Sequence, residues 1–195
     1  KEVGIKPTPS IGGVGLIKNY KKMISMDLKE IDNLVLIIGK TEGHIDQSLF
    51  ARTILDEKNG PPPEVNLFNE KNNGESILNL IDKGYVKSAH DISLGGLLVA
   101  ISKMCIKGNK GIKINKSKNL INEIEYFFAE DQGRYLIEVN KEDLKEVTKI
   151  LDKNSVHHEE LGIIIENDMI INEKTKVTID ELKSYYTNWL SKYMS

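Results

Sequence analysis

Hydrophobic residues recur at helical spacing in several parts of the chain. The clearest case is the C-terminal stretch, where Thr178 and Glu181 form a capping box that predicts a helix over residues 178–193. Its apolar stripe consists of Leu182, Tyr185, Tyr186, Trp189, Leu190 and Tyr193. A second stripe predicts a helix over residues 95–107 and consists of Leu97, Ala100, Ile101, Met104 and Cys105. Further helices are predicted at residues 46–56, 75–83 and 140–151, the last capped by Asn140.

Short aliphatic runs between these helices predict strands. They lie at residues 13–17, 34–38, 85–89, 112–114, 135–139 and 161–165. Residues 166–168 form a turn that predicts a hairpin between 161–165 and 169–171, so the sheet is not purely parallel. We expect a mixed α/β fold in a single domain over residues 1–195, with residues 1–10 as an extended lead-in shaped by two prolines.

Charge and composition exclude several classes of protein. The 27 Lys and Arg residues against 29 Asp and Glu give a net charge of −2, so no basic field exists for nucleic acid or an anionic membrane. The lysines of residues 107–118 are expected to face water. No apolar run approaches the roughly 18–20 residues of a membrane span. Cys105 is the only cysteine, which excludes an intrachain disulfide and fits a soluble protein of a reducing compartment. Because the chain starts with Lys1, we expect a piece of a longer protein.

The first candidate site is the glycine-rich turn at residues 88–96, S-A-H-D-I-S-L-G-G, which opens a predicted helix. Backbone N–H groups at such a turn suit a phosphate or carboxylate, and His90 and Asp91 could transfer protons or bind a metal. In the alternative interpretation, Ser93 caps the helix and the glycines allow close packing.

The second candidate site is residues 127–134, F-F-A-E-D-Q-G-R. Arg134 is one of only two arginines, and its planar fork suits a carboxylate or phosphate, although Glu130 and Asp131 could pair with it instead. The glycines at residues 7–15 lack the lysine of a P-loop and favour an unusual backbone path over phosphate binding. Neither His157 nor His158 fits a zinc pattern, and both are expected on the surface.

Four motifs taken together resemble one enzyme family. They are P-T-P-S-I-G-G-V-G-L-I (7–17), S-A-H-D-I-S-L-G-G-L (88–97), F-F-A-E-D-Q-G-R-Y (127–135) and the closing helix around Trp189. In this combination the chain resembles the C-terminal subdomain of phosphoribosylformylglycinamidine synthase, subunit II, in the aminoimidazole ribonucleotide synthase superfamily. The resemblance implies an α/β (α+β) fold with a mixed, largely antiparallel sheet packed by helices.

The resemblance also implies an activity for the parent enzyme. Such enzymes convert formylglycinamide ribonucleotide and ammonia to formylglycinamidine ribonucleotide in cytoplasmic purine synthesis, with ATP and Mg²⁺, through phosphoryl activation of the amide oxygen. A glutaminase subunit supplies ammonia, and a small accessory subunit completes the assembly. Sister enzymes such as aminoimidazole ribonucleotide synthase, selenophosphate synthetase or thiamine monophosphate kinase are the alternative, and the Pro-Thr-Pro and Glu-Asp-Gln-Gly-Arg segments argue against them.

By the symmetry of the two halves of such enzymes, this chain would hold no catalytic residue and would line an auxiliary nucleotide or phosphate site. The residues expected there are His90, Asp91, Ser93, Gly95, Gly96, Glu130, Gln132 and Arg134. The chain departs from the family pattern with Asp131 in place of Ser and Leu94 in place of Asp.

Two roles for these residues stay open. In one, His90, Asp91, Glu130, Gln132 and Arg134 take part directly in catalysis. In the other, which we favour, the chain is a structural module that holds the two halves together and clamps a nucleotide that is not hydrolysed. On its own it is then expected to be inactive, to expose an apolar edge toward the remaining subdomains, and to self-associate.

Overall fold

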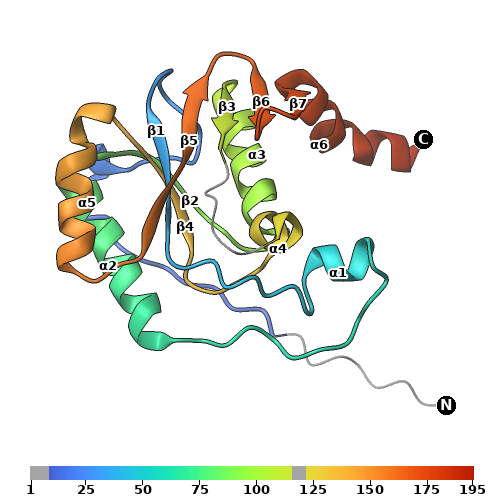
Figure 1. The fold of residues 1–195 in the computed structure, drawn as a ribbon, viewed down its shortest axis with the longest axis horizontal. Helices are drawn as coiled ribbons and strands as arrows, with labels where there is room; N and C mark the ends of the chain where they lie inside the picture. The colour runs from blue at the N-terminus through green and yellow to red at the C-terminus, as the bar shows by residue number, and fades with distance from the viewer. Residues whose placement is uncertain (1–8, 116–121) are drawn as a thin grey trace.

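A seven-stranded sheet crosses the middle of the molecule in the computed structural model, which describes residues 9–115 and 122–195 (Figure 1). Its strands are β1 (Leu34–Ile38), β2 (Val86–Asp91), β3 (Gly111–Ile114), β4 (Tyr135–Val139), β5 (His158–Ile165), β6 (Asp168–Ile171) and β7 (Thr175–Thr178). The spatial order is β2-β4-β1-β5-β3-β6-β7, and every neighbouring pair is antiparallel except β3 with β6. The expected mixed, largely antiparallel sheet is confirmed.

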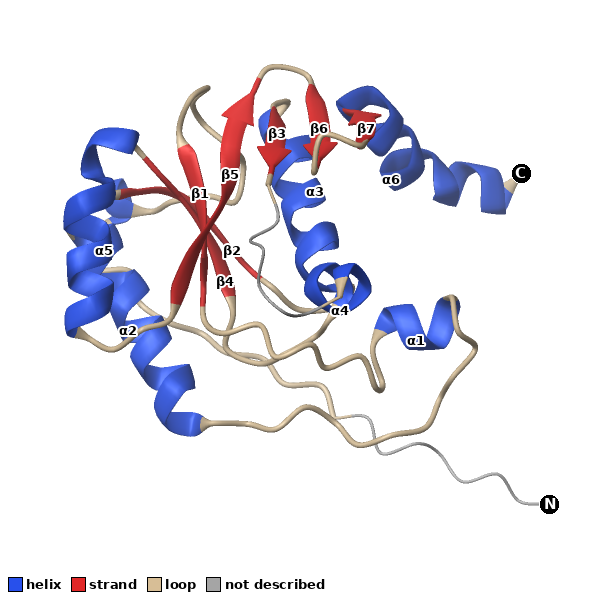
Figure 2. Cartoon of the chain, in the orientation of Figure 1, coloured by secondary structure: helices blue, strands red, loops and turns tan. Residues whose placement is uncertain are grey.

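Helices cover both faces of this sheet. They are α1 (Leu49–Thr53), α2 (Leu67–Asp82), α3 (Gly96–Gly108), α4 (Glu123–Phe128), α5 (Leu144–Lys153) and α6 (Ile179–Met194), with 3-10 turns at Tyr20–Lys22 and Lys141–Asp143. Figure 2 shows α2 and α5 on one side of the strands and α3 and α4 on the other. The result is a three-layer α/β/α arrangement.

The central strand β1 explains why the layers hold together. All five of its residues are buried, and alternate side chains point to opposite faces. Val35 and Ile37 belong to the core under α3, whereas Leu34, Leu36 and Ile38 belong to the core under α2 and α5. The uninterrupted apolar run at residues 34–38 therefore reflects a strand covered on both sides.

Two strand predictions are wrong. Residues 13–17 form no strand, and Val14 and Leu16 are fully exposed. β5 and β6 do not pair as a hairpin, because β3 lies between them, antiparallel to β5 and parallel to β6. Gly162 makes this insertion possible, since a Cβ there would lie 2.1 Å from the Lys113 carbonyl oxygen. The hairpin partner of β6 is β7, across a turn in which Asn172 and Glu173 both have positive φ, as a type I′ turn requires.

Helix boundaries differ from the sequence pattern at four places. The helix predicted at 46–56 shrinks to α1, and the one predicted at 75–83 already begins at Leu67. Asn140 makes no capping hydrogen bond and precedes a 3-10 turn, whereas Asn122 caps the unpredicted α4 by accepting from the Glu125 N–H. The capping box of α6 is confirmed, since the Thr178 side chain accepts from the Glu181 N–H. Residues 1–8 of the expected lead-in, and Lys116 and Lys118, lie outside the described residues.

None of the helices in the described ranges is long and apolar enough to cross a membrane.

Cys105 lies in the core under α3, as its place in the apolar stripe predicts. Burial raises the pKa of its thiol to about 12, so at pH 8 only about one molecule in 10⁴ carries the reactive thiolate. We expect Cys105 in the folded protein to react with a thiol-directed reagent at least about 100-fold more slowly than in denaturant, measured by stopped-flow absorbance. A Ser191→Cys variant, whose new thiol lies on an exposed residue, should label one equivalent at once. Equal rates for Cys105 in the folded and denatured protein would contradict its burial.

Candidate functional site

The sheet brings the two main candidate motifs together. Residues 88–96 run from β2 into α3, and residues 127–134 run from α4 into β4. Because β2 pairs antiparallel with β4, Asp91 at the end of β2 lies opposite Tyr135 at the start of β4. Both motifs therefore occupy the same end of the sheet.

A carboxylate of the chain itself occupies the N-terminus of α3. The Oε1 atom of Glu130 accepts the N–H of Gly95 at 2.8 Å and the N–H of Leu49 at 2.7 Å. Unpaired N–H groups at the start of a helix attract anions, and here an internal anion satisfies the donor that a phosphate would use. Glu130 thus joins the start of α1 to the start of α3.

Asp131 holds the loop that follows β1. Its carboxylate accepts the N–H groups of Glu42 at 3.0 Å, Gly43 at 3.2 Å and His44 at 3.0 Å, and its side chain is only 7% exposed. Hydrogen bonds to a charged acceptor are stronger than neutral ones. A serine, with a single hydroxyl on a shorter side chain, offers fewer acceptor positions. Asp131, which stands where the family pattern has Ser, therefore stabilises the loop at residues 42–44.

Arg134 completes this group and is 1% exposed. It donates to the Ala129 carbonyl oxygen at 2.6 Å and to the Thr41 hydroxyl at 3.1 Å, and its guanidinium lies 3.7 Å from the Asp131 carboxylate. Burial lowers the pKa of the guanidinium, although the Asp131 charge opposes that shift. Glu130, Asp131 and Arg134, called the loop clamp below, tie three segments together from inside the protein.

Gly96 allows the first turn of α3 to lie against residues 128–129, which directly precede the loop clamp. Its φ is +73°, and a Cβ there would lie 2.7 Å from the Phe128 carbonyl carbon and 2.8 Å from the Ala129 oxygen. Both contacts are with backbone, which cannot rotate away as a side chain can. The close-packing interpretation therefore holds for Gly96. The expected cap at Ser93 is wrong, because the N-cap of α3 is Gly95 and no side chain caps it.

Three candidate residues, Asp91, Ser93 and Gln132, keep exposed side chains, whereas the side chain of His90 is 16% exposed and its Nε2 atom is buried. His90 Nδ1 lies 2.9 Å from the Asp91 carboxylate, while Ser93 and Gln132 are exposed. Burial raises the pKa of Asp91, but hydrogen bonds from Ser93 and His90 and the charge of His90 outweigh it, and the net shift is downward. Asp91 is therefore an anion at neutral pH, so it repels a phosphate at this end of the sheet unless a cation accompanies it.

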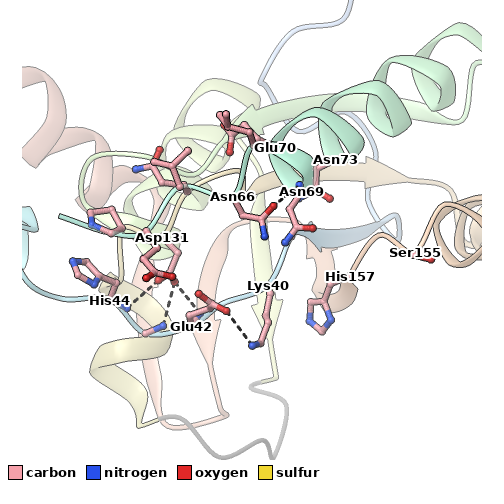
Figure 3. A pocket seen from close by; sticks show the side chains of 17 residues that line it. Lys40, Glu42, His44, Asn66, Asn69, Glu70, Asn73, Asp131, Ser155 and His157 are labelled. Carbon is pink, nitrogen blue, oxygen red and sulfur yellow. Dashed lines mark hydrogen bonds and ion pairs between the residues drawn. The ribbon is translucent and has the colours of Figure 1, made fainter. Parts of the chain in front are cut away.

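A pocket of about 960 Å³ opens beside the clamp (Figure 3). Of the candidate residues only Gln132 lines it, together with Asp131 of the clamp. Figure 3 shows Asn66, Asn69 and Asn73 of the α2 region facing the loop after β1 across this pocket. The remaining lining residues are Gly39, Lys40, Glu42, Gly43, His44, Pro63, Glu64, Val65, Leu67, Glu70, Ser155 and His157.

The charge of the pocket favours neutral or cationic groups. Its lining includes four carboxylates and one lysine, Lys40, which itself pairs with Glu42 at 3.0 Å. Asp131 already accepts three backbone N–H groups. This balance disfavours a free polyphosphate.

Sequence reasoning missed most of the pocket. The asparagines sit in a polar stretch that looks like an ordinary exposed helix, and only the buried Asn73, which donates to the Gly133 carbonyl oxygen at 2.9 Å, departs from that pattern. Of the two histidines expected on the surface, His157 is exposed and lines the pocket, and His158 is half-buried.

The fold and this site define a class of protein. Residues 30–172 match the family model described as "AIR synthase related protein, C-terminal domain", and the chain belongs to that family. The resemblance found in the motifs is thereby confirmed at the level of the family.

Individual relatives carry one name. A protein of Pelagibacter ubique called phosphoribosylformylglycinamidine synthase subunit PurL is 66% identical over 194 residues, which cover 100% of this chain and 27% of that protein. The protein of that name from Bartonella henselae is 36% identical over 190 residues, covering 97% of this chain and 26% of its own length. The chain thus spans about a quarter of the length of these relatives.

Solved structures agree on the fold. Thermotoga maritima PurL complexed with FGAR matches with a TM-score of 0.69 at 19% identity, over 84% of this chain and 30% of that one. E. coli HypE, a hydrogenase maturation protein, matches with a TM-score of 0.59 at 17% identity, over 82% of this chain and 52% of that one. The expected likeness to the C-terminal domain of aminoimidazole ribonucleotide synthase-type enzymes is confirmed for the fold.

Proposed function

We propose that this chain is the C-terminal domain, residues 1–195, of a phosphoribosylformylglycinamidine synthase. The single observation that supports this most strongly is the 66% identity to the PurL subunit over the whole chain. The longer protein would be a cytoplasmic ATP-dependent carbon–nitrogen ligase that converts formylglycinamide ribonucleotide and ammonia to formylglycinamidine ribonucleotide. A glutaminase subunit and a small accessory subunit would be its partners, the former supplying ammonia. A structure called PurLQS from Thermotoga maritima is among the matches and is consistent with such an assembly.

Within that enzyme, the domain would be structural. Glu130 and Arg134 have their polar groups turned to the chain itself, and the N-terminus of α3 holds an internal carboxylate. These contacts support the interpretation of the second motif as a clamp. Any auxiliary nucleotide contact would be made by the exposed side chains of Ser93 and Gln132, with Asp91 and the half-buried His90 beside them.

Among the described residues, no three His, Cys, Asp or Glu side chains lie close enough together to hold a metal ion. Mg²⁺ at nucleotide sites is usually held by one or two carboxylates together with phosphate oxygens. From the symmetry of the two halves, we propose that Mg²⁺ and the catalytic ATP bind to the rest of the longer protein.

The test is an assay of the longer protein with ATP and ammonia, and with each candidate substrate in turn. We expect ADP and formylglycinamidine ribonucleotide to form with formylglycinamide ribonucleotide. ATP consumption that depends on formylglycinamidine ribonucleotide, selenide or thiamine monophosphate instead would assign the chain to a sister enzyme. We expect the isolated chain to form no product, because it spans only about a quarter of the length of its relatives and half of any shared site is missing. Product from the isolated chain would refute the structural role.

The auxiliary contact needs variants that leave the clamp intact. Arg134 is unsuitable, because removing a fully buried charge perturbs the fold. We expect the longer protein with Ser93→Ala and Gln132→Ala, both at exposed neutral positions, to retain at least fivefold less tightly bound nucleotide, measured after denaturation by chromatography. If the amount of bound nucleotide is unchanged but kcat falls sharply, the residues of the segments 88–96 and 127–134 take part directly in catalysis.

A further inference from the structure

The C-terminal helix α6 leaves the body of the protein soon after it starts. Ile179 is buried and Leu182 packs against the core under α3, and Lys183 donates a hydrogen bond to Asn109. Every residue from Ser184 onward is exposed. Figure 1 shows the red helix running away from the sheet toward the C-terminus.

The exposed part of α6 carries an aromatic stripe. Tyr185 is 73% exposed, Tyr186 49%, Trp189 61%, Leu190 53% and Tyr193 81%. Their spacing of three and four residues places them on one side of the helix, and none is charged. Tyrosine and tryptophan are the residue types most enriched at the centres of protein interfaces.

This arrangement is unfavourable without a partner. A helical segment of about eleven residues is marginal in water on its own, and only the first turn of α6 packs on the body. Contiguous exposed apolar surface of this kind marks an interaction site in a soluble protein. The phenol and indole groups at the edge of the stripe also call for hydrogen-bond partners once they are covered.

The comparisons indicate what covers the stripe. The family match ends at residue 172, so α6 lies outside the shared domain. The relative that matches the whole chain, α6 included, is nearly four times as long, since the chain covers 27% of it. The segment before the family match shows the same feature at the other end, with Ile11, Val14 and Leu16 each at least 91% exposed. Both flanks of the shared domain thus carry apolar side chains that its own core does not use.

We propose that α6 is a docking arm, and that its stripe from Tyr185 to Tyr193 packs on another domain of the same longer polypeptide. The inference rests on the proposed function only in requiring that the chain is part of a longer protein. In this proposal, the apolar edge expected from the sequence is the stripe on α6, and another domain of the same polypeptide covers it.

Oxidative footprinting of the longer protein, read by mass spectrometry, tests this directly. We expect Trp189, Tyr186 and Tyr193 to be oxidised at least tenfold more slowly in the native protein than in denaturant, at the same rate over a 100-fold range of protein concentration. Without added subunits, this protection must come from the same polypeptide.

Matched variants locate the contact. Trp189→Ala with Leu190→Ala removes the centre of the stripe, and Thr187→Ala with Ser191→Ala changes the opposite face of the same helix. We expect oxidation of Tyr186 and Tyr193 to rise at least fivefold in the first variant and to change less than twofold in the second. If the first variant does not fold, the oxidation rates of the stripe in the unmodified protein still test whether the stripe is covered.

Three outcomes would overturn the proposal. Rapid oxidation of the stripe at all concentrations means that nothing covers it. Protection that appears only at high concentration, together with a dimer in sedimentation, means that a second copy covers it. Protection that appears only after the glutaminase or accessory subunit is added assigns the stripe to that subunit. Synthase activity of the same preparation is measured in parallel. An active protein whose stripe is not protected from oxidation overturns the docking arm alone. An inactive unmodified protein overturns the proposed function.

Discussion

Gly96→Ala is expected to lower the free energy of unfolding by at least about 3 kcal/mol, or roughly 10 °C in melting temperature for a chain of this size. Two effects combine. The backbone at Gly96 has a φ of +73°, and the added Cβ would meet the Phe128 and Ala129 backbone at 2.7–2.8 Å. Neither backbone segment can make room for the Cβ unless α3 moves away from residues 128–129. Urea denaturation followed by circular dichroism measures the change.

Gly84→Ala is the matched control. Gly84 has a similarly positive φ of +81°, but no atom lies within 4 Å of the position of its Cβ. It therefore isolates the backbone cost, which is about 1 kcal/mol. If both variants lose the same free energy of unfolding, the close approach of α3 to residues 128–129 contributes nothing to the effect of Gly96→Ala.

Glu138→Gln is expected to destabilise the protein by about 3 kcal/mol. Glu138 lies in β4 with no solvent exposure. Its carboxylate accepts the N–H groups of Lys29 at 2.8 Å and Glu30 at 3.0 Å, the side-chain amide of Asn33 at 2.8 Å and the hydroxyl of Ser88 at 2.9 Å. A glutamine turns one of these acceptors into a donor that faces other donors, and it removes the charge that strengthens the remaining bonds.

Glu142→Gln provides the comparison for this substitution. Glu142 follows the same strand but is exposed, so the same chemical change there should alter the free energy of unfolding by less than about 0.5 kcal/mol. The difference between the two variants, measured by denaturant titration at pH 7, reports the buried carboxylate network. A loss below about 1 kcal/mol for Glu138→Gln would show that the four donors find other acceptors.

Glu138 and the loop clamp serve the same structural purpose at different places. Glu138 holds residues 29–33 before β1, and Asp131 holds residues 42–44 after it. In both cases a buried carboxylate collects backbone N–H groups from a loop far away in sequence. Such loops have no regular structure to satisfy their donors, so burying them requires an internal acceptor.

Local pattern was sufficient for the elements whose identity depends on neighbouring residues. The apolar run at 34–38 predicted a strand, the stripe of residues 95–107 predicted α3 and the burial of Cys105, and the Thr178 capping box predicted the start of α6. The four motifs in combination also predicted the family, which the match over residues 30–172 confirms. These features depend on side-chain periodicity and on hydrogen bonds within one turn of the chain.

Features that depend on contacts between distant segments came only from the folded chain. The alternating residues 13–17 have strand character but no neighbouring strand within the described residues, and β3 separates β5 from β6 although a short turn joins them in sequence. Glu130 could be read from the sequence as a partner of Arg134 or as a ligand of phosphate. Its real acceptor role toward Gly95 and Leu49 follows from the fold, which brings the starts of α1 and α3 to the same carboxylate. Strand order and hydrogen-bond partners are set by long-range packing, whose energy no local window of sequence contains.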